Sequence, residues 1–210
     1  MKPIEELIEV MKKICQEKIE LNSSGNISIR LPDGRVAIKP KGMPYSDVTT
    51  ENISIVDIDG NTISGNPPSS DLLAHLIIYQ KRPNIHCIIH THSHFATVFA
   101  VLGIPINVFS TLTADYFGEP IECLSFVNHR EENFGLSIAQ SKKEVFLLGK
   151  HGAILLGNSI QDTVKRVFAL EESAKINYHV LLLANNAGIH VDSILNEDIQ
   201  SMRQFYVQKY

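Results

Sequence analysis

The chain has no tryptophan, few cysteines and almost no excess of charge. Its three cysteines, Cys15, Cys87 and Cys123, are scattered, and they lack both the C-x-x-C spacing of a structural zinc site and the even count of a disulfide framework. We therefore expect reduced thiols and a cytoplasmic protein. The formal net charge of -4 offers no basic face, which argues against nucleic acid or an anionic membrane as a partner.

Long hydrophobic runs are also missing. The most apolar stretches, such as 145–148 and 180–183, are far shorter than the roughly 20 apolar residues that span a bilayer. Residues 1–20 alternate apolar and charged positions, which does not indicate a signal peptide. A chain of 210 residues, 44% of them hydrophobic, is long enough for one well-packed domain. We expect a single α/β domain over residues 1–210.

Hydrophobic periodicity indicates alternating short strands and helices. It predicts helices over residues 4–20, from Ser69 or Ser70 to 80, over 95–102 and 159–184, and from 197 to the end. It predicts strands at 26–30, 35–39, 53–58, 62–64, 87–89, 121–124, 145–148 and 153–156. The first two strands flank Pro32-Asp33-Gly34 and should form a hairpin, whereas residues 111–116 are expected to be irregular.

Histidines concentrate in the run HCIIHTHSH, where four of the nine lie within residues 86–94. His90 and His92 follow an apolar strand and stand two residues apart, so their side chains face the same side. This spacing is typical of a metal-chelating pair. Core histidines that bond to backbone groups would show the same pattern, so the spacing alone does not decide between the two interpretations.

A catalytic metal centre usually has three protein ligands and an open position. His151 is the best third candidate, because it lies between two apolar strands and precedes Gly152, which leaves room for close approach of a substrate or backbone. Asp71, near a predicted helix start, is a candidate for a fourth ligand or a general base. An aspartate at this position is also an ordinary helix cap.

Two further segments have the chemistry of a phosphate site. Residues 68–71 combine two hydroxyls with the free N–H groups of a helix start, which suits an anion. Residues 39–42, with sequence KPKG, would add cationic donors. Taken alone, both segments are better explained as solvated surface turns.

The ordered combination of motifs is more specific than any one of them. GNISIR, KPKGMPY, PPSSD, HTHSH, TADYFGEPI and KHGAILLG resemble the class II aldolase/adducin family across almost the whole chain. This resemblance implies a largely antiparallel central sheet flanked by helices, a cytosolic homotetramer with active sites between subunits, and a divalent metal, usually Zn²⁺. It implies that the metal ligands are His90, His92 and His151. It places the substrate's phosphate at Asn26, Lys39, Lys41, Gly42, Ser69 and Ser70.

Within the family, the residue after the two serines separates the subgroups. It is typically a glutamate, serving as acid/base, in the aldolases, and a metal-associated aspartate in the L-ribulose-5-phosphate 4-epimerases. Here it is Asp71. The later segment ADYF, with Asp115, and the preceding Thr111 also match the epimerase pattern. The chain therefore resembles the epimerases more than the aldolases.

The chain departs from the epimerase pattern in two places. Lys41 replaces a small residue and would put an extra cation beside the phosphate. At the C-terminal end, Phe205 replaces a histidine, and the position of the catalytic tyrosine lies beyond residue 210. Either the chain is truncated here, or Tyr206 or Tyr210 substitutes, or the reaction differs.

The resemblance leads to the hypothesis of a metal-dependent retro-aldol epimerisation of a pentulose 5-phosphate. Asp115 would handle the proton of the C4 oxygen on one face of the substrate, and a tyrosine from a neighbouring chain would do so on the other. One alternative is an aldolase that cleaves a deoxy-ketose 1-phosphate such as L-fuculose 1-phosphate. A dehydratase or decarboxylase would use the same metal triad. A non-catalytic, adducin-like structural protein is the alternative from another class, and it should have eroded metal ligands.

Overall fold

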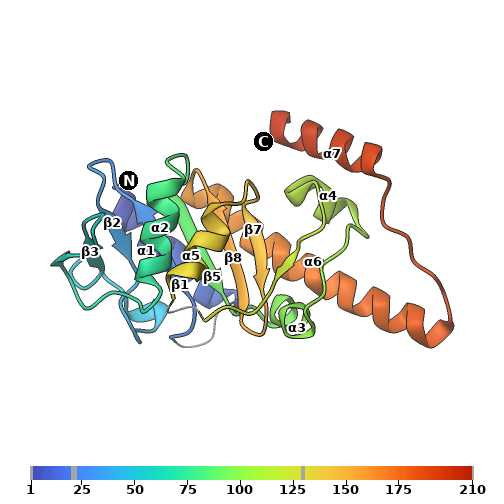
Figure 1. Cartoon of the computed structure of the whole chain (residues 1–210), viewed down its shortest axis with the longest axis horizontal. Helices are drawn as coiled ribbons and strands as arrows, with labels where there is room; N and C mark the ends of the chain where they lie inside the picture. The colour runs from blue at the N-terminus through green and yellow to red at the C-terminus, as the bar shows by residue number, and fades with distance from the viewer. Residues whose placement is uncertain (1, 20–22, 129–130, 210) are drawn as a thin grey trace.

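An eight-stranded sheet forms the centre of the computed structural model, which describes residues 2–19, 23–128 and 131–209 (Figure 1). The strand order is β4-β3-β2-β1-β5-β8-β7-β6, and all neighbours are antiparallel except β6 and β7. The strands are β1 (Asn26–Arg30), β2 (Val36–Ile38), β3 (Ser54–Val56), β4 (Thr62–Ser64), β5 (Cys87–Thr91), β6 (Cys123–Leu124), β7 (Val145–Leu148) and β8 (Gly152–Gly157). The predicted, largely antiparallel sheet is confirmed.

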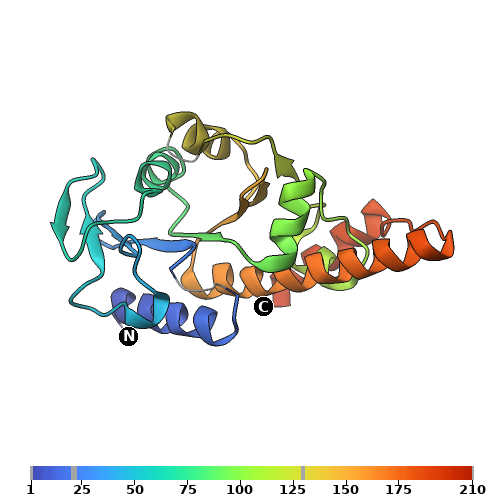
Figure 2. The ribbon, with the colours of Figure 1, turned by 90° about the horizontal axis from the view of Figure 1, so that it is seen from below.

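Helices cover both faces of the sheet. The helices are α1 (Pro3–Gln16), α2 (Leu72–Lys81), α3 (His94–Leu102), α4 (Thr111–Phe117), α5 (Glu132–Ala139), α6 (Ile160–Ala187) and α7 (Asn196–Lys209), with a 3-10 turn, η1 (Tyr45–Asp47). α1, α3 and α6 pack on one face, and α2 and α5 pack on the other (Figure 2). Successive side chains of β5 point to opposite faces of the sheet. Cys87 and Ile89 therefore pack in the core under α1, α3 and α6, and Ile88 packs in the core under α2 and α5.

Several predicted element boundaries were wrong. Residues 111–116, predicted to be irregular, lie within α4, which packs on α6 and α7 and is followed by its C-cap, Gly118, with φ of 68°. α5 was not predicted at all. The opening helix ends at Gln16, whereas position 20, its predicted end, lies outside the described residues. The strand predicted over 121–124 retains only its last two residues.

The start of α2 also differs from the prediction. Neither Ser69 nor Ser70 is the N-cap, because Asp71 occupies that position and helical residues begin at Leu72. The Asp71 side chain makes no capping hydrogen bond and is therefore available to other partners. Ser69 still contributes locally, since its Oγ accepts a hydrogen bond from the Asp71 backbone N–H at 3.3 Å.

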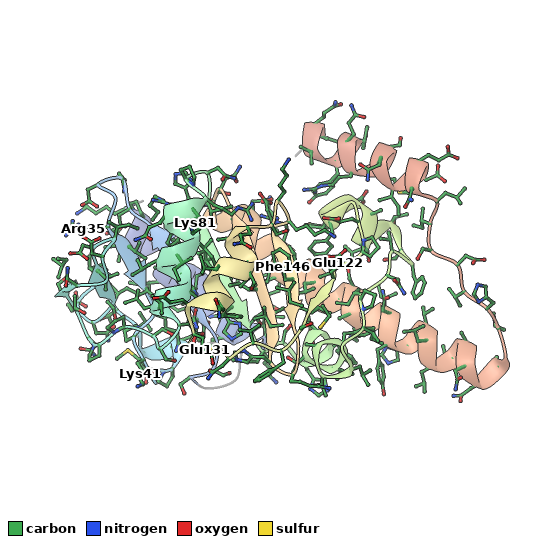
Figure 3. All side chains as sticks on the ribbon, viewed as in Figure 1. Arg35, Lys41, Lys81, Glu122, Glu131 and Phe146 are labelled. Carbon is green, nitrogen blue, oxygen red and sulfur yellow. The ribbon has the colours of Figure 1, made fainter. Side chains whose placement is uncertain are left out.

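The C-terminal third of the chain extends beyond the sheet. α6 continues past its predicted end at 184 to Ala187, where Gly188 with φ of 65° ends it. The chain then returns, and α7 packs on α4 through a small cluster of Val108, Ala114 and Ile199 (Figure 1). Near its C-terminal end α6 lies apart from the sheet, and Leu181, Leu182 and Leu183 are exposed there (Figure 3). None of the helices in the described ranges combines the length and apolar character needed to cross a membrane.

Candidate active site

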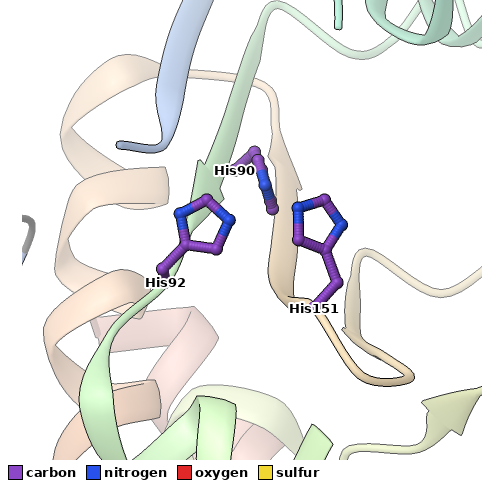
Figure 4. A group of neighbouring side chains, drawn as sticks. All are labelled: His90, His92 and His151. Atoms are coloured by element: carbon purple, nitrogen blue, oxygen red, sulfur yellow. The ribbon is translucent and has the colours of Figure 1, made fainter. Parts of the chain in front are cut away.

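Three imidazoles converge at the end of β5. His90 lies on β5, His92 follows the strand, and His151 lies in the turn between β7 and β8 (Figure 4). The ring centroids are 4.5 Å apart for His90 and His92, 4.6 Å for His90 and His151, and 5.0 Å for His92 and His151. One nitrogen from each ring lies within 4.8 Å of the other two. The predicted grouping of the three histidines is confirmed as geometry.

The hydrogen bonding of His90 prepares one nitrogen for a ligand. Its Nδ1–H donates to the Ala153 carbonyl at 2.9 Å, which leaves the Nε2 lone pair directed elsewhere. Nε2 is buried and has no hydrogen-bond partner among the described residues. Burial, and then the neighbouring His92, lower the pKa of His90 to about 3. The ring is therefore neutral at physiological pH, which is the state that binds metal.

Asp71 approaches the same nitrogen from the start of α2. Its Oδ2 lies 3.9 Å from His90 Nε2 and accepts a hydrogen bond from Asn26 Nδ2 at 2.6 Å. Asn26 on β1 is the cross-strand partner of His90 on β5, so the sheet register sets this arrangement. The buried carboxylate adds an oxygen donor to the nitrogen donors of the imidazole cluster. Such a donor set fits a divalent metal, although it does not distinguish zinc from cobalt or manganese.

The turn that carries His151 is held tightly against its surroundings. A Cβ on Gly152 would lie 2.4 Å from the Thr91 carbonyl oxygen, so only glycine allows this approach. Lys150 adopts a left-handed conformation with φ of 62°. Its backbone N–H donates to the Ala100 carbonyl at 3.0 Å, and its Nζ donates to the Val101 carbonyl. These contacts fix the turn on the last turn of α3, where the Ala100 carbonyl also accepts a hydrogen bond from the Gly103 backbone N–H at 3.3 Å.

A cavity of about 200 Å³ lies beside the imidazoles. Its lining includes the three histidines, Asp71 and all six residues that the sequence predicted for phosphate: Asn26, Lys39, Lys41, Gly42, Ser69 and Ser70. Two backbone hydrogen bonds join the loops around 40 and 68, from Lys41 N to the Pro67 carbonyl at 2.9 Å and from Ser69 N to the Lys39 carbonyl at 3.1 Å. The buried Lys39 donates through Nζ to the Ser23 carbonyl at 2.9 Å.

The other predicted residues lie elsewhere in the chain. Asp115 and Tyr206 line a separate open groove of about 500 Å³, together with Tyr116, Lys165 and Phe205. The Tyr116 and Tyr206 rings lie 4.8 Å apart, and burial is the largest of the effects that raise the pKa of Tyr206. Thr111 is exposed at the start of α4 and lines neither site, and Tyr210 lies outside the described residues.

Comparison with known proteins identifies the family of this chain. The sequence profile described as Class II Aldolase and Adducin N-terminal domain matches residues 5–178. The chain belongs to the class II aldolase/adducin family. Members similar to it differ in their reactions. An L-fuculose phosphate aldolase of Methanococcus vannielii is 30% identical over 178 residues, covering 85% of this chain and 97% of that protein.

A second family member is an epimerase. L-ribulose-5-phosphate 4-epimerase UlaF of Salmonella paratyphi C is 34% identical over 167 residues, which cover 72% of this chain and 73% of that protein. Among solved structures, an L-fuculose 1-phosphate aldolase superposes with a TM-score of 0.86 at 27% identity, covering 97% of this chain and 95% of that one. The similarity thus shows the fold and the family, and leaves the substrate unresolved.

Two parts of the cavity were not selected from the sequence. Ser23 and Ser24 line it beside Gly25 and Asn26, although neither serine was predicted to be a site residue. The only signal was the position of this polar segment directly before a strand. Ser23 and Ser24 directly precede the GNISIR motif in the sequence.

Proposed function

We propose that this chain is a metal-dependent sugar-phosphate enzyme, and specifically an L-ribulose-5-phosphate 4-epimerase. The observation that carries the proposal is the position of Asp71, which takes the place of the glutamate typical of the family's aldolases. Asp71 is anchored by Asn26 and lies 3.9 Å from His90 Nε2. A carboxylate held this close to the imidazoles suits a metal-associated role better than that of an acid/base reaching toward substrate.

The substrate's phosphate is assigned to the cationic side of the cavity. Lys39 and Lys41 supply ammonium donors and the side chains of Ser69 and Ser70 supply hydroxyl donors, the groups that recognise phosphate. Asn26 and Gly42 line the same cavity. The reacting carbons would then lie toward the histidines at the other side.

A divalent metal, most simply Zn²⁺, held by His90, His92 and His151 with Asp71 beside them, would supply Lewis-acid stabilisation of negative charge on the substrate. The reaction breaks C3–C4, with the electron pair going to C3 and the C4 hydroxyl becoming an aldehyde. After rotation of the aldehyde, C3 adds to its other face. Asp115 would take or return the proton of the C4 oxygen on one face, and Tyr206 or Tyr210 on the other.

Asp115 and Tyr206 line a groove separate from the histidine cavity of their own chain. We infer that they complete the site of a neighbouring copy, in a cytoplasmic homotetramer with intersubunit active sites. Exposed apolar residues along α6, including Leu181, Leu182 and Leu183, give such an assembly a surface to bury.

Incubation of the purified protein with L-ribulose 5-phosphate tests the proposed reaction. We expect formation of D-xylulose 5-phosphate, loss of activity with a chelator and recovery with Zn²⁺. Asp115→Asn should cause a large loss. Net cleavage to two fragments without the epimer would instead identify an aldolase, for which L-fuculose 1-phosphate is the substrate to test. Absence of bound metal and of both reactions would favour a non-catalytic, adducin-like role.

A further inference from the structure

A line of buried polar pairs runs between β1 and α2, away from the histidine cluster. On β1, the alternate residues Asn26, Ser28 and Arg30 face α2, because Ile27 and Ile29 belong to the opposite core. On α2, Asp71, His75 and Tyr79 follow at intervals of four residues and so share one face. The two sets meet residue by residue.

Each pair is in direct contact. Asn26 Nδ2 donates to Asp71 Oδ2 at 2.6 Å. Ser28 Oγ lies 2.7 Å from His75 Nδ1 and 2.8 Å from the Tyr79 hydroxyl. The Arg30 guanidinium lies over the Tyr79 ring, 4.9 Å from its centroid, and also donates to the Tyr79 carbonyl.

These polar groups lie at an otherwise apolar interface, formed by Ile38, Ile88, Leu76 and other side chains. A buried polar group without its hydrogen bonds costs free energy. Only one register of α2 on β1 therefore lets all these polar groups form their hydrogen bonds. A shift of α2 by one residue would move Asp71 by about 1.5 Å along the helix axis and rotate it by about 100° around it. The line therefore controls where Asp71 stands relative to His90.

His75 is the central member. It is fully buried, its Nδ1 contacts Ser28, and its Nε2 has no hydrogen-bond partner among the described residues. Burial lowers the pKa of His75 to about 4, against an opposing effect of the Asp71 carboxylate, so the ring is neutral at pH 7. A neutral ring fixed on one side by Ser28 supports the first turn of α2 without bringing a second charge near Asp71.

We propose that His75 is a positioning residue that, through Ser28 and the register of α2, holds the Asp71 carboxylate beside His90. This role rests on the proposed metal-binding function of the cluster. His75 would then contribute to the metal affinity, although it is buried in α2 and does not line the substrate cavity.

Titration of metal-free protein with Co²⁺ tests this role, with the visible absorption spectrum as the readout. His75→Phe keeps the size of the ring and the Ser28–Tyr79 bond but removes Nδ1. We expect it to weaken Co²⁺ binding by about 10- to 100-fold and to alter the spectrum, the range found for residues that orient metal ligands. His75→Asn, which restores a polar atom near the position of Nδ1, should recover part of the loss.

Combining His75→Phe with Asp71→Asn tests whether His75 acts through the Asp71 carboxylate. If His75 acts through Asp71, His75→Phe should weaken Co²⁺ binding no further once Asp71 is replaced. Leu76→Ala is the matched control, because it removes apolar packing from the same helix and should lower stability while retaining Co²⁺ affinity.

Four results would overturn the role of His75. Unchanged affinity in His75→Phe would do so while leaving the metal-dependent function intact, as would an equal loss in the Asp71→Asn background. An equal loss in Leu76→Ala would reduce the effect to general destabilisation. A wild-type protein that binds no Co²⁺ would overturn the metal-dependent function and this role together.

Discussion

The turn after β7, which carries His151, has no room for a side chain at Gly152. Gly152 lies so close to β5 that an added Cβ would be 2.4 Å from the Thr91 carbonyl oxygen and 3.1 Å from His92 Cδ2. The backbone cannot yield there without disturbing the β5–β8 pairing, in which Thr91 is the partner of Ala153. Close approach at Gly152, predicted from the sequence, is thus a contact with the backbone of the strand that carries His90.

Gly152→Ala should therefore damage the metal cluster and the fold together. We expect weaker Co²⁺ binding and a loss of unfolding free energy of about 1–3 kcal/mol, the usual cost of forcing an extra carbon into a packed site. Isothermal titration and urea unfolding measure the two effects. His94→Ala, at an exposed histidine of the same run, is the control and should change neither. Wild-type affinity in Gly152→Ala would show that the turn adapts freely.

The buried His75 should make the stability of the metal-free protein depend on pH. Its pKa falls from about 6.5 in the unfolded chain to about 4 in the fold, so the unfolded chain binds the proton more readily. This group's contribution is fully present above pH 6.5 and is lost as the pH falls toward 4. The loss between pH 7 and pH 5 amounts to about 2 kcal/mol.

Urea unfolding of wild type and His75→Asn at pH 7 and pH 5 measures this contribution. Because His90 and other groups titrate equally in both proteins, the difference between them isolates His75. We expect the variant to lose less stability on acidification. Equal losses in the two proteins would contradict a depressed pKa for His75.

At the scale of residues, the sequence identified the candidate metal donors but not the side chains that support them. Strand alternation put His90 and His92 on one face, His151 was a candidate from its place between two strands, and the family resemblance implied that all three are ligands. His75 gave no such signal, because a histidine within an apolar helix is recognisable as part of a network only when Ser28, 47 positions away in the chain, is seen 2.7 Å from it. Local spacing predicts which atoms can bind a metal, whereas partners distant in sequence require the fold.

Secondary-structure elements were predictable where local chemistry and tertiary packing agree. The hairpin of β1 and β2 around Pro32-Asp33-Gly34 formed as expected, because the turn and the alternating strands favour it together. α4 did not follow its local pattern, since seven residues with two threonines form a stable helix only through packing on α6 and α7. Short elements of this kind depend on neighbours that the local sequence does not reveal.

The start of α6 offers a test at the scale of the element. Ser159 is its N-cap, and the Ser159 side chain accepts a hydrogen bond from the Asp162 backbone N–H at 3.2 Å. Ser159→Ala should lower the free energy of unfolding by about 1 kcal/mol, because an N–H of the first turn loses its acceptor. Urea unfolding measures the change. Ser201→Ala on the exposed side of α7 is the control, and a similar loss there would deny a capping role to Ser159.

The whole molecule separates the predicted site into two parts. The histidines, Asp71 and the phosphate-type residues surround one cavity, and Asp115 and Tyr206 line another groove near the junction of α4 and α7. The family resemblance implied that the catalytic tyrosine comes from a neighbouring chain. It did not indicate that Asp115 also lies apart from the histidines of its own chain, because the position of α4 depends on its packing against α6 and α7. Within one chain the two groups do not line a common pocket, so the proposed chemistry that uses both predicts that a second copy completes the site.

Mixing two inactive variants tests whether copies complete one another. His92→Ala removes a metal ligand from the first group, and Asp115→Asn removes the carboxylate from the second. If sites form between chains, unfolding and refolding the two variants together should restore about a quarter of wild-type activity, because random assembly gives that share of sites two intact halves. Epimer formation from L-ribulose 5-phosphate measures the recovery, and each variant refolded alone is the control. Absence of recovery in mixtures that contain both chains in one oligomer would show that Asp115 acts within its own chain, which would require α4 to move toward the histidines.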